Sequence, residues 1–171
     1  RWGAAAGFRS LEVSRIFALP YVSKMKDGFK KAHELAPENK LILRALVDTY
    51  SVLPAFLGGD INYAKEKANT LLVLDSLEGH FATGYIAEIE NQPGQAKRYY
   101  KMGFKFYKDL KSKNQNTQFL KLARRELMYE IGSTAVRFQI DYGIGTEMLQ
   151  EYLKQYTKRD VISLKWVYFR L

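Results

Sequence analysis

The sequence predicts an all-α protein, and three observations support that prediction. Apolar residues recur at spacings of three and four along most of the chain, which is the period of a helix with one buried face. Only 4 of the 171 residues are proline, so long helices can form without interruption. No segment combines the alternation of a strand with the turn residues of a hairpin.

The first part of the chain predicts three helices. Small and apolar residues predict the first helix over 3–17. Leu19-Pro20 predicts a break after it, because proline cannot donate the hydrogen bond that continues a helix. The second helix is predicted over 21–35 and ends before Pro37. The third is predicted over 40–53.

A glycine-containing loop separates the third helix from the fourth. Residues 54–60 read Pro-Ala-Phe-Leu-Gly-Gly-Asp, and the paired glycines permit backbone angles that other residues avoid. Asp60 is a good N-cap for a helix over 61–74. A fifth helix is predicted over 77–90, followed by a turn at 91–94 whose Asn-Gln-Pro-Gly sequence is rich in turn residues.

The remainder predicts four further helices, of which the last is cut by the chain end. A polar connector at 112–116 and a loop at 141–145 separate them, and Thr146 is the expected N-cap after the loop. These helices are expected over 95–111, 117–139, 146–156 and 161–171.

Several of these helix pairs carry the same spacing of aromatic, small and proline residues. Phe29 is followed by Ala32 three residues later and by Pro37 five residues after that, and Tyr100 is followed by Gly103 at the same first spacing. Small residues are needed where two helices cross closely, so they mark the crossing points of a repeated pair. The residues at repeat-defining positions are Phe29, Ala32, Pro37, Leu46, Tyr50, Ala64, Gly84, Ala96, Tyr100 and Gly103.

This spacing resembles the tetratricopeptide repeat family. The resemblance implies an α-α superhelix, a right-handed solenoid of antiparallel helix pairs, over a single domain of residues 1–171. It is firmest over 24–111. The middle repeat departs from the family pattern by the inserted 54–60 loop and by Val47 at a small position, and beyond Thr117 only Ile131-Gly132 and Tyr152 match.

The inserted loop carries a second, finer resemblance. Its Pro-x-x-Leu-Gly-Gly-Asp pattern is similar to a loop of bacterial tetratricopeptide proteins that work beside substrate-binding-protein-dependent transporters. That resemblance implies a bacterial periplasmic or cell-envelope location.

Both ends of the sequence suggest an internal piece of a longer chain. The chain begins at Arg1 without a starting methionine and closes on an apolar, aromatic run. Because a truncated solenoid exposes an apolar end, we expect copies to pair through Trp166, Val167 and Phe169.

The net charge of +9 favours acidic partners, which include nucleic acid, an anionic membrane surface and an acidic protein. The lysines are interleaved with acidic residues, however, which is typical of a solvated surface. The segment 97–108 mixes lysines with aromatics as nucleic-acid-binding proteins do. At helical spacing it separates into one core stripe containing Tyr100, Phe104 and Tyr107 and one solvated lysine stripe.

Residues for catalysis are sparse in the sequence. The chain has no cysteine and two histidines, His33 and His80, and neither histidine has a partner at metal-ligand spacing. The Gly58-Gly59-Asp60 loop opens a helix but lacks the lysine and hydroxyl residue of a phosphate loop. We expect no enzyme activity, no metal and no cofactor. No apolar run reaches the length of a membrane span.

The sequence therefore predicts a binding scaffold for a protein or peptide, with a basic module that binds nucleic acid or another anion as the alternative. In such solenoids the first helix of each pair lines the concave groove. Tyrosine and arginine there supply contact area at low entropic cost, although the same residues can serve packing between repeats. The candidate partner-binding residues are Tyr50, Tyr85, Glu88, Asn91, Arg137 and Gln139.

Overall fold

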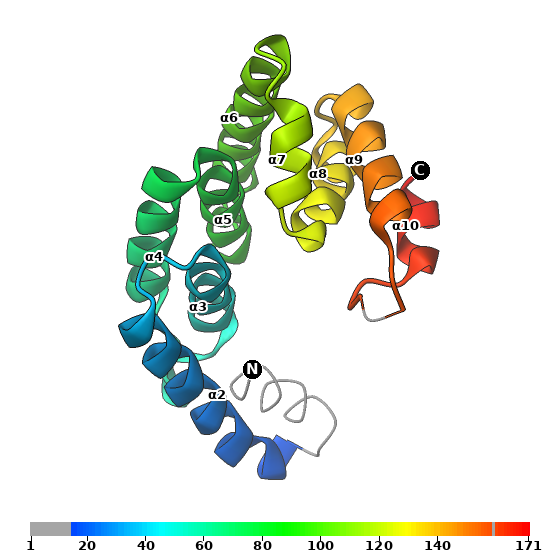
Figure 1. Cartoon of the computed structure of the whole chain (residues 1–171). Helices are drawn as coiled ribbons and strands as arrows, with labels where there is room; N and C mark the ends of the chain where they lie inside the picture. The colour runs from blue at the N-terminus through cyan, green and yellow to red at the C-terminus, as the bar shows by residue number, and fades with distance from the viewer. Residues whose placement is uncertain (1–14, 159) are drawn as a thin grey trace. The chain divides into compact units, whose positions relative to one another are not determined.

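The computed structural model describes residues 15–158 and 160–171, and within them it is all-helical (Figure 1). Over these residues there are nine α-helices, α2 to α10, one short 3-10 helix, η1, and no strand. This confirms the all-α prediction. The helix predicted over 3–17 lies almost entirely outside the described residues.

The chain divides into two compact units, of which unit 1 ends at Ala96 and unit 2 begins at Lys97. Within each unit helices pack against their neighbours. The right-handed superhelix and the single repeat domain over 1–171 stay predictions. Stacked repeats contact mainly their neighbours, so a division into two compact units is compatible with one repeat domain and with two separate domains.

The helices of unit 1 follow the sequence prediction closely except at the start. Their bounds are α2 Arg15–Leu35, α3 Lys40–Val52, η1 Ala55–Leu57, α4 Ile61–Leu74 and α5 Ser76–Ile89. The break predicted at Leu19-Pro20 is wrong, because α2 runs through Pro20. Pro20 lies within α2, where its missing N–H removes a single backbone hydrogen bond. The turns of α2 that follow Pro20 keep their backbone hydrogen bonds.

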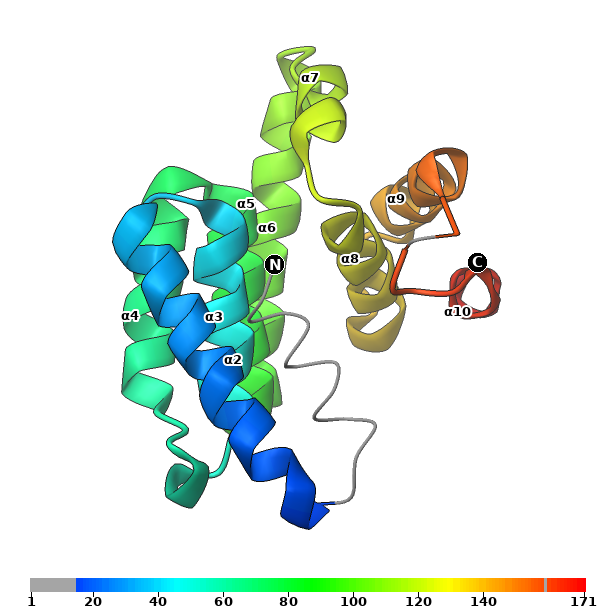
Figure 2. The same cartoon turned by 60° about the horizontal axis from the view of Figure 1, so that its bottom comes forward.

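The core of unit 1 is formed where α3, α4 and α5 pack together, with α2 lying along α3 (Figures 1 and 2). Ala64 and Ala68 of α4 are buried, and their small side chains let the helices approach closely. Leu41 of α3 is exposed and lies outside this core. The buried residues of this core are Leu43, Leu46, Val47, Tyr50, Ala64, Ala68, Leu71, Ala82 and Ile86.

Short polar side chains start three successive helices of unit 1. The Asn39 Oδ1 atom accepts from the backbone N–H of Leu41 at 3.0 Å, and Asp60 Oδ1 accepts from Asn62 and Tyr63, also at 3.0 Å. Asp75 is the N-cap of α5. These bonds satisfy amides that would otherwise lack partners at the helix ends. The N-cap predicted at Asp60 is thus confirmed.

The turn between α4 and α5 depends on a glycine. Asp75 alone separates the two helices, so their backbones lie close together. A Cβ atom placed on Gly79 would lie 2.2 Å from the Leu72 Cα atom, a separation that no side chain tolerates. Gly79 therefore permits the close packing of α4 on α5.

Helix α6 spans Pro93–Ser112, so Pro93 begins the helix where the sequence suggested the end of a turn. Proline is well tolerated at that position, since the first amides of a helix have no intrahelical acceptor. The core stripe predicted on this helix is confirmed, with Tyr100, Phe104 and Tyr107 buried while Lys101 and Lys105 are exposed. The lysine stripe therefore lies beside a packed face.

The long helix predicted over 117–139 is wrong, because it is two helices. Helix α7 is Asn116–Leu122 and α8 is Arg125–Phe138, separated by extended backbone at Ala123 and Arg124. The Arg124 Nη2 atom lies 3.0 Å from Glu130 Oε2. Six residues apart on one continuous helix, these side chains would point to different sides, so the break is what lets them pair.

The loop predicted at 141–145 and the cap predicted at Thr146 are also wrong, because α9 is Tyr142–Gln155 and contains both positions. A Cβ on Gly145 would lie 2.4 Å from the Ala135 Cβ atom of α8. A Cβ on Gly132 of α8 would lie 2.3 Å from Leu149 Cγ. These glycines serve the close packing of α8 on α9 rather than a loop.

The C-terminal part of unit 2 is held by a small set of polar contacts. Helix α10, Leu164–Arg170, packs on α8 and α9. The Tyr152 hydroxyl donates to the Ile162 carbonyl at 2.7 Å, and Asp160 pairs with Arg125. The segment between α9 and α10 is therefore tied to α8 and α9 from both sides.

Tyr152 makes the stability of unit 2 sensitive to alkaline pH. Burial first, and then the negative charge of Asp160, raise the pKa of Tyr152 from 10.0 to about 12. The unfolded chain loses this proton near its ordinary pKa while the folded chain keeps it, so stability is complete below pH 10 and falls as pH rises towards 12.

We expect urea unfolding of the wild type to show this loss between pH 10 and pH 12, and Tyr152→Phe to show less of it. The phenylalanine variant should start about 1 kcal/mol less stable at neutral pH, because it lacks the bond to Ile162. An identical alkaline slope in both proteins would contradict this assignment.

Candidate functional site

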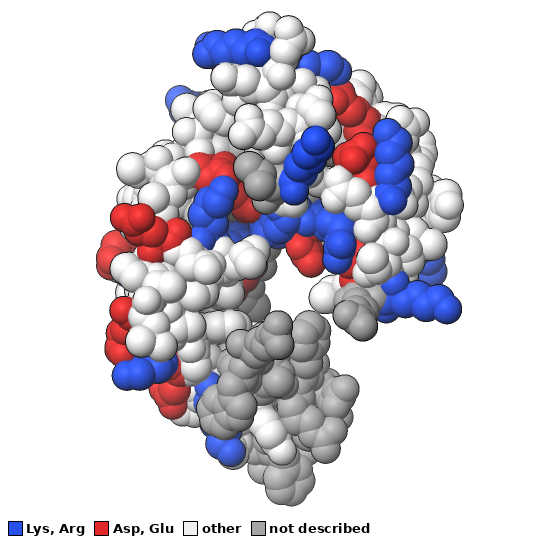
Figure 3. Space-filling view, in the orientation of Figure 1, with Lys and Arg blue, Asp and Glu red and all other residues white. Residues whose placement is uncertain are grey.

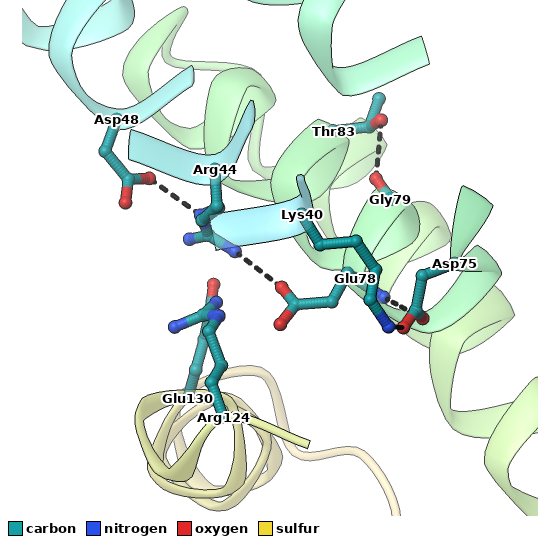
Figure 4. Close-up of polar contacts among 9 residues, drawn as sticks. All are labelled: Lys40, Arg44, Asp48, Asp75, Glu78, Gly79, Thr83, Arg124 and Glu130. Atoms are coloured by element: carbon teal, nitrogen blue, oxygen red, sulfur yellow. Dashed lines mark hydrogen bonds and ion pairs between the residues drawn. The ribbon is translucent and has the colours of Figure 1, made fainter. Parts of the chain in front are cut away.

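Helices α3 and α5 of unit 1 contact each other and share a polar surface (Figure 4). On α3 the side chains of Lys40, Arg44 and Asp48 recur every fourth residue and so lie along one face. Glu78 and Tyr85 of α5 meet them. We call these five residues the polar row.

Arg44 lies at the centre of the polar row. Its Nε atom donates to Asp48 Oδ1 at 2.8 Å, its Nη1 atom is 3.8 Å from Glu78 Oε2, and its guanidinium lies 5.6 Å from the centre of the Tyr85 ring. Arg44 is only 7% exposed and Glu78 only 5%. Two opposite charges removed from water attract each other, so Glu78 helps to hold the guanidinium that lies beside the Tyr85 ring.

The ends of the row remain accessible. Lys40 Nζ binds Asp75 Oδ2 at 2.7 Å, and about half of the Lys40 side chain is exposed. Asp48 is similarly exposed, and Tyr85 is half-buried. The row therefore presents positive, negative and aromatic groups that are held in place by buried contacts. Such pre-organised groups bind a partner with little loss of side-chain entropy.

The predicted candidate residues fall into different environments. Tyr50 is 4% exposed and belongs to the core of unit 1, where its ring lies 4.7 Å from that of Tyr63. Its burial favours the packing role that the sequence left open. Tyr85 and Glu88 lie on α5, and both are half-buried.

Asn91 and Gln139 are distinguished by their backbone angles. Both have positive φ, 57° for Asn91 and 54° for Gln139, in the left-handed region that often ends a helix. Arg137 is exposed, and its guanidinium lies 5.2 Å from the centre of the Phe138 ring. Arg137 and Gln139 belong to unit 2 and the other candidates to unit 1, so partner binding by all of them together stays a prediction.

Sequence reasoning missed Arg44 and Glu78. The spacing of Lys40, Arg44 and Asp48 was a usable signal, because charged residues four apart on a helix are neighbours. Nothing in the sequence indicates that Glu78 meets Arg44, since the two lie on different helices.

Groups that could bind a metal ion do not gather in the part of the chain that is described. No cluster of three or more histidine, aspartate or glutamate side chains there has metal-binding geometry. Burial lowers the pKa of His80, and burial together with the nearby Lys67 charge lowers that of His33, both from 6.5.

Surface charge is mixed. On the face drawn in Figure 3, lysine and arginine side chains are interspersed with aspartate and glutamate.

On α10, Trp166 and Phe169 are exposed, but Val167 is fully buried against its own unit. Val167 is therefore wrong as a pairing residue, and pairing of copies through the other two stays a prediction.

None of the helices within 15–158 and 160–171 has the length and apolar character that crossing a membrane requires. A scan against protein-family models gives no match, and a search of curated proteins gives none either. The likeness to the tetratricopeptide repeat therefore rests on the spacing of the residues in this chain.

Proposed function

We propose that this chain is a non-enzymatic scaffold that binds a protein or peptide partner through the polar row. The observation that supports this is the contact between α3 and α5, which places Lys40, Asp48 and Tyr85 on one surface around the buried Arg44–Glu78 pair. The first helices of neighbouring pairs lie side by side in tetratricopeptide solenoids, and that surface is where the sequence resemblance expects a partner.

The polar row suits a peptide that carries both charged and apolar groups. Lys40 and Asp48 offer opposite charges at its two ends, and the Tyr85 ring between them offers apolar area. Rigid aromatic and charged groups of this kind dominate the affinity of many interfaces. Glu88, one turn beyond Tyr85 on α5, extends the surface.

The proposal is tested by selecting peptides from a displayed random library on the purified chain and measuring the affinity of the enriched peptides by fluorescence anisotropy. Tyr85→Ala is expected to weaken binding by about tenfold or more, since loss of a central aromatic contact costs over 1 kcal/mol. Glu88→Lys is expected to weaken it as well.

Glu34→Lys is the matched control, because Glu34 is an exposed residue of α2 and the substitution changes the net charge equally. It should leave peptide affinity unchanged. If no peptide is enriched, or if Tyr85→Ala binds as the wild type does, the proposal fails. Oligonucleotide binding that falls steeply with salt would favour the anionic-partner alternative instead.

A further inference from the structure

We propose that unit 1 contains a phosphate-binding site between α2, α3 and α4, in which the Tyr50 hydroxyl and the ammonium groups of Lys26 and Lys30 are the donors. The site uses α2 and α4 rather than α5, so it is separate from the polar row. Four features of the described residues support it.

The first feature is an unpartnered hydroxyl. Only 4% of the Tyr50 surface is exposed, and its hydroxyl oxygen has no hydrogen-bond partner. Leaving a buried donor unsatisfied is costly, and each such group in a native protein calls for an explanation. A bound oxyanion that accepts from this hydroxyl supplies one.

The second feature is the convergence of two cations on the same side chain. Lys26 and Lys30 lie one turn apart on α2, and their Nζ atoms are 5.7 Å and 5.9 Å from the centre of the Tyr50 ring. Among the described residues, neither makes an ion pair with a carboxylate at the distances that define one. Two like charges near the same side chain repel each other, and a bound dianion reduces that repulsion.

The third feature is the loop at 54–60, which holds one of the cations in place. Lys26 Nζ donates to the Leu57 carbonyl at 3.0 Å. Gly58 adopts a φ of 78°, and a Cβ there would lie 2.0 Å from the same Nζ atom. Glycine therefore allows the loop to hold the Lys26 ammonium close to its backbone, which positions this donor before a ligand arrives.

The fourth feature is a further buried cation on α4. Lys67 is only 8% exposed, and its Nζ atom lies 4.7 Å from the centre of the Tyr63 ring, which itself packs on Tyr50. Its ion-pair partner is the adjacent Glu66, an exposed side chain. Buried lysines are rare unless they are well paired, so Lys67 adds a buried positive charge beside the two tyrosine rings.

The charges of this cluster favour phosphate over a carboxylate. Asp27 of α2 and Asp60, which caps α4, lie near the Tyr50 hydroxyl, and after burial and Tyr63 their charges raise the pKa of Tyr50. Lys26, Lys30 and Lys67 supply three positive charges around the two tyrosine rings, so a phosphate dianion gains more from them than a carboxylate with a single charge does. Lysine is also a common phosphate ligand, acting as a point charge.

The test is thermal unfolding of the whole chain in inorganic phosphate and in sodium chloride of equal ionic strength. At about ten times the dissociation constant, phosphate should raise the wild-type Tm by about 4 °C more than chloride does. Tyr50→Phe should keep or raise the Tm without phosphate, because it removes the unsatisfied hydroxyl, and should lose most of the phosphate-dependent rise.

Lys30→Gln should also lose most of that rise. Its matched control is Lys31→Gln, which removes the same charge from the next residue of α2, where Lys31 is exposed and pairs with Glu34 at 3.4 Å. The control should respond to phosphate as the wild type does. O-phosphoserine in place of inorganic phosphate separates the two sources: a response to both indicates a site for phosphate esters, and a response to inorganic phosphate alone indicates the free ion.

Two results overturn the proposal. One is a wild-type Tm that rises equally in phosphate and in chloride. The other is an equal loss of the phosphate response in Lys30→Gln and Lys31→Gln, which would mean a diffuse effect of positive charge. Because the probe is phosphate alone, either result leaves peptide binding by the polar row untouched.

Discussion

Replacing Arg44 by leucine is expected to destabilise unit 1 by about 3–5 kcal/mol, because it removes a buried cation that faces the buried Glu78 carboxylate. Both side chains are almost fully removed from water, and the ionic atoms are 3.8 Å apart. The lost bond to Asp48 matters less, since that residue is half-exposed and water can replace the guanidinium. Urea unfolding followed by circular dichroism measures the change.

Two further variants separate this effect from a general loss of charge. Lys31→Leu breaks the exposed Lys31–Glu34 pair and should change stability by less than about 1 kcal/mol. The double variant Arg44→Leu/Glu78→Leu should recover most of the stability that the single variant loses, because it removes both charges of the buried pair. A double variant no more stable than Arg44→Leu would contradict the assigned role of the pair.

Gly145→Ala is expected to destabilise unit 2 by about 2 kcal/mol, because the added methyl group overpacks the contact between α8 and α9. The new Cβ would lie 2.4 Å from the Ala135 Cβ atom, so the two helices must move apart. The substitution itself favours helix formation by up to about 1 kcal/mol, and the clash has to exceed that gain. Thermal unfolding of unit 2 reports the net change.

Gly143→Ala is the matched control, since Gly143 lies in the same helix two residues earlier and a Cβ there meets nothing within 4 Å. Without a clash, alanine should leave stability unchanged or raise it by up to about 1 kcal/mol. If both variants were stabilised, the close approach of α8 and α9 at Gly145 would not hold in solution.

Arg44 links the stability of unit 1 to the proposed binding. Arg44 is buried, so its expected part in binding is to hold Tyr85 in position rather than to touch a partner. A helix surface that is already ordered loses less entropy when a peptide binds. We therefore expect the buried Arg44–Glu78 pair to order the surface of unit 1 for peptide binding.

The sequence by itself determined the helices whose ends have strong local signals. Asp60 caps α4, and the bounds of α4, Ile61–Leu74, are those that the sequence predicts. Asn39 likewise precedes α3. A capping side chain bonds to amides two or three residues away, so its effect of about 1 kcal/mol is present in the local sequence and needs no distant partner.

The candidate site could be predicted only in part for a related reason. The side-chain spacing along α3 was visible, and Tyr85 was identified on α5. The pairing of Arg44 with Glu78 joins residues 34 positions apart, and the burial of Tyr50 depends on helices on either side of it. Contacts of that range follow from packing, which the local pattern does not contain.

Tertiary structure alone decided the features that ran against local preference. Pro20 lies within α2, and Gly145 lies within α9. Helix α7 ends before Ala123 although no glycine or proline stands there. Local propensities differ by about 1 kcal/mol for glycine and 3 kcal/mol for proline, and burial of whole side chains against a second helix can outweigh them. The sequence therefore determines where most helices form, while packing between helices decides where they join, break and approach.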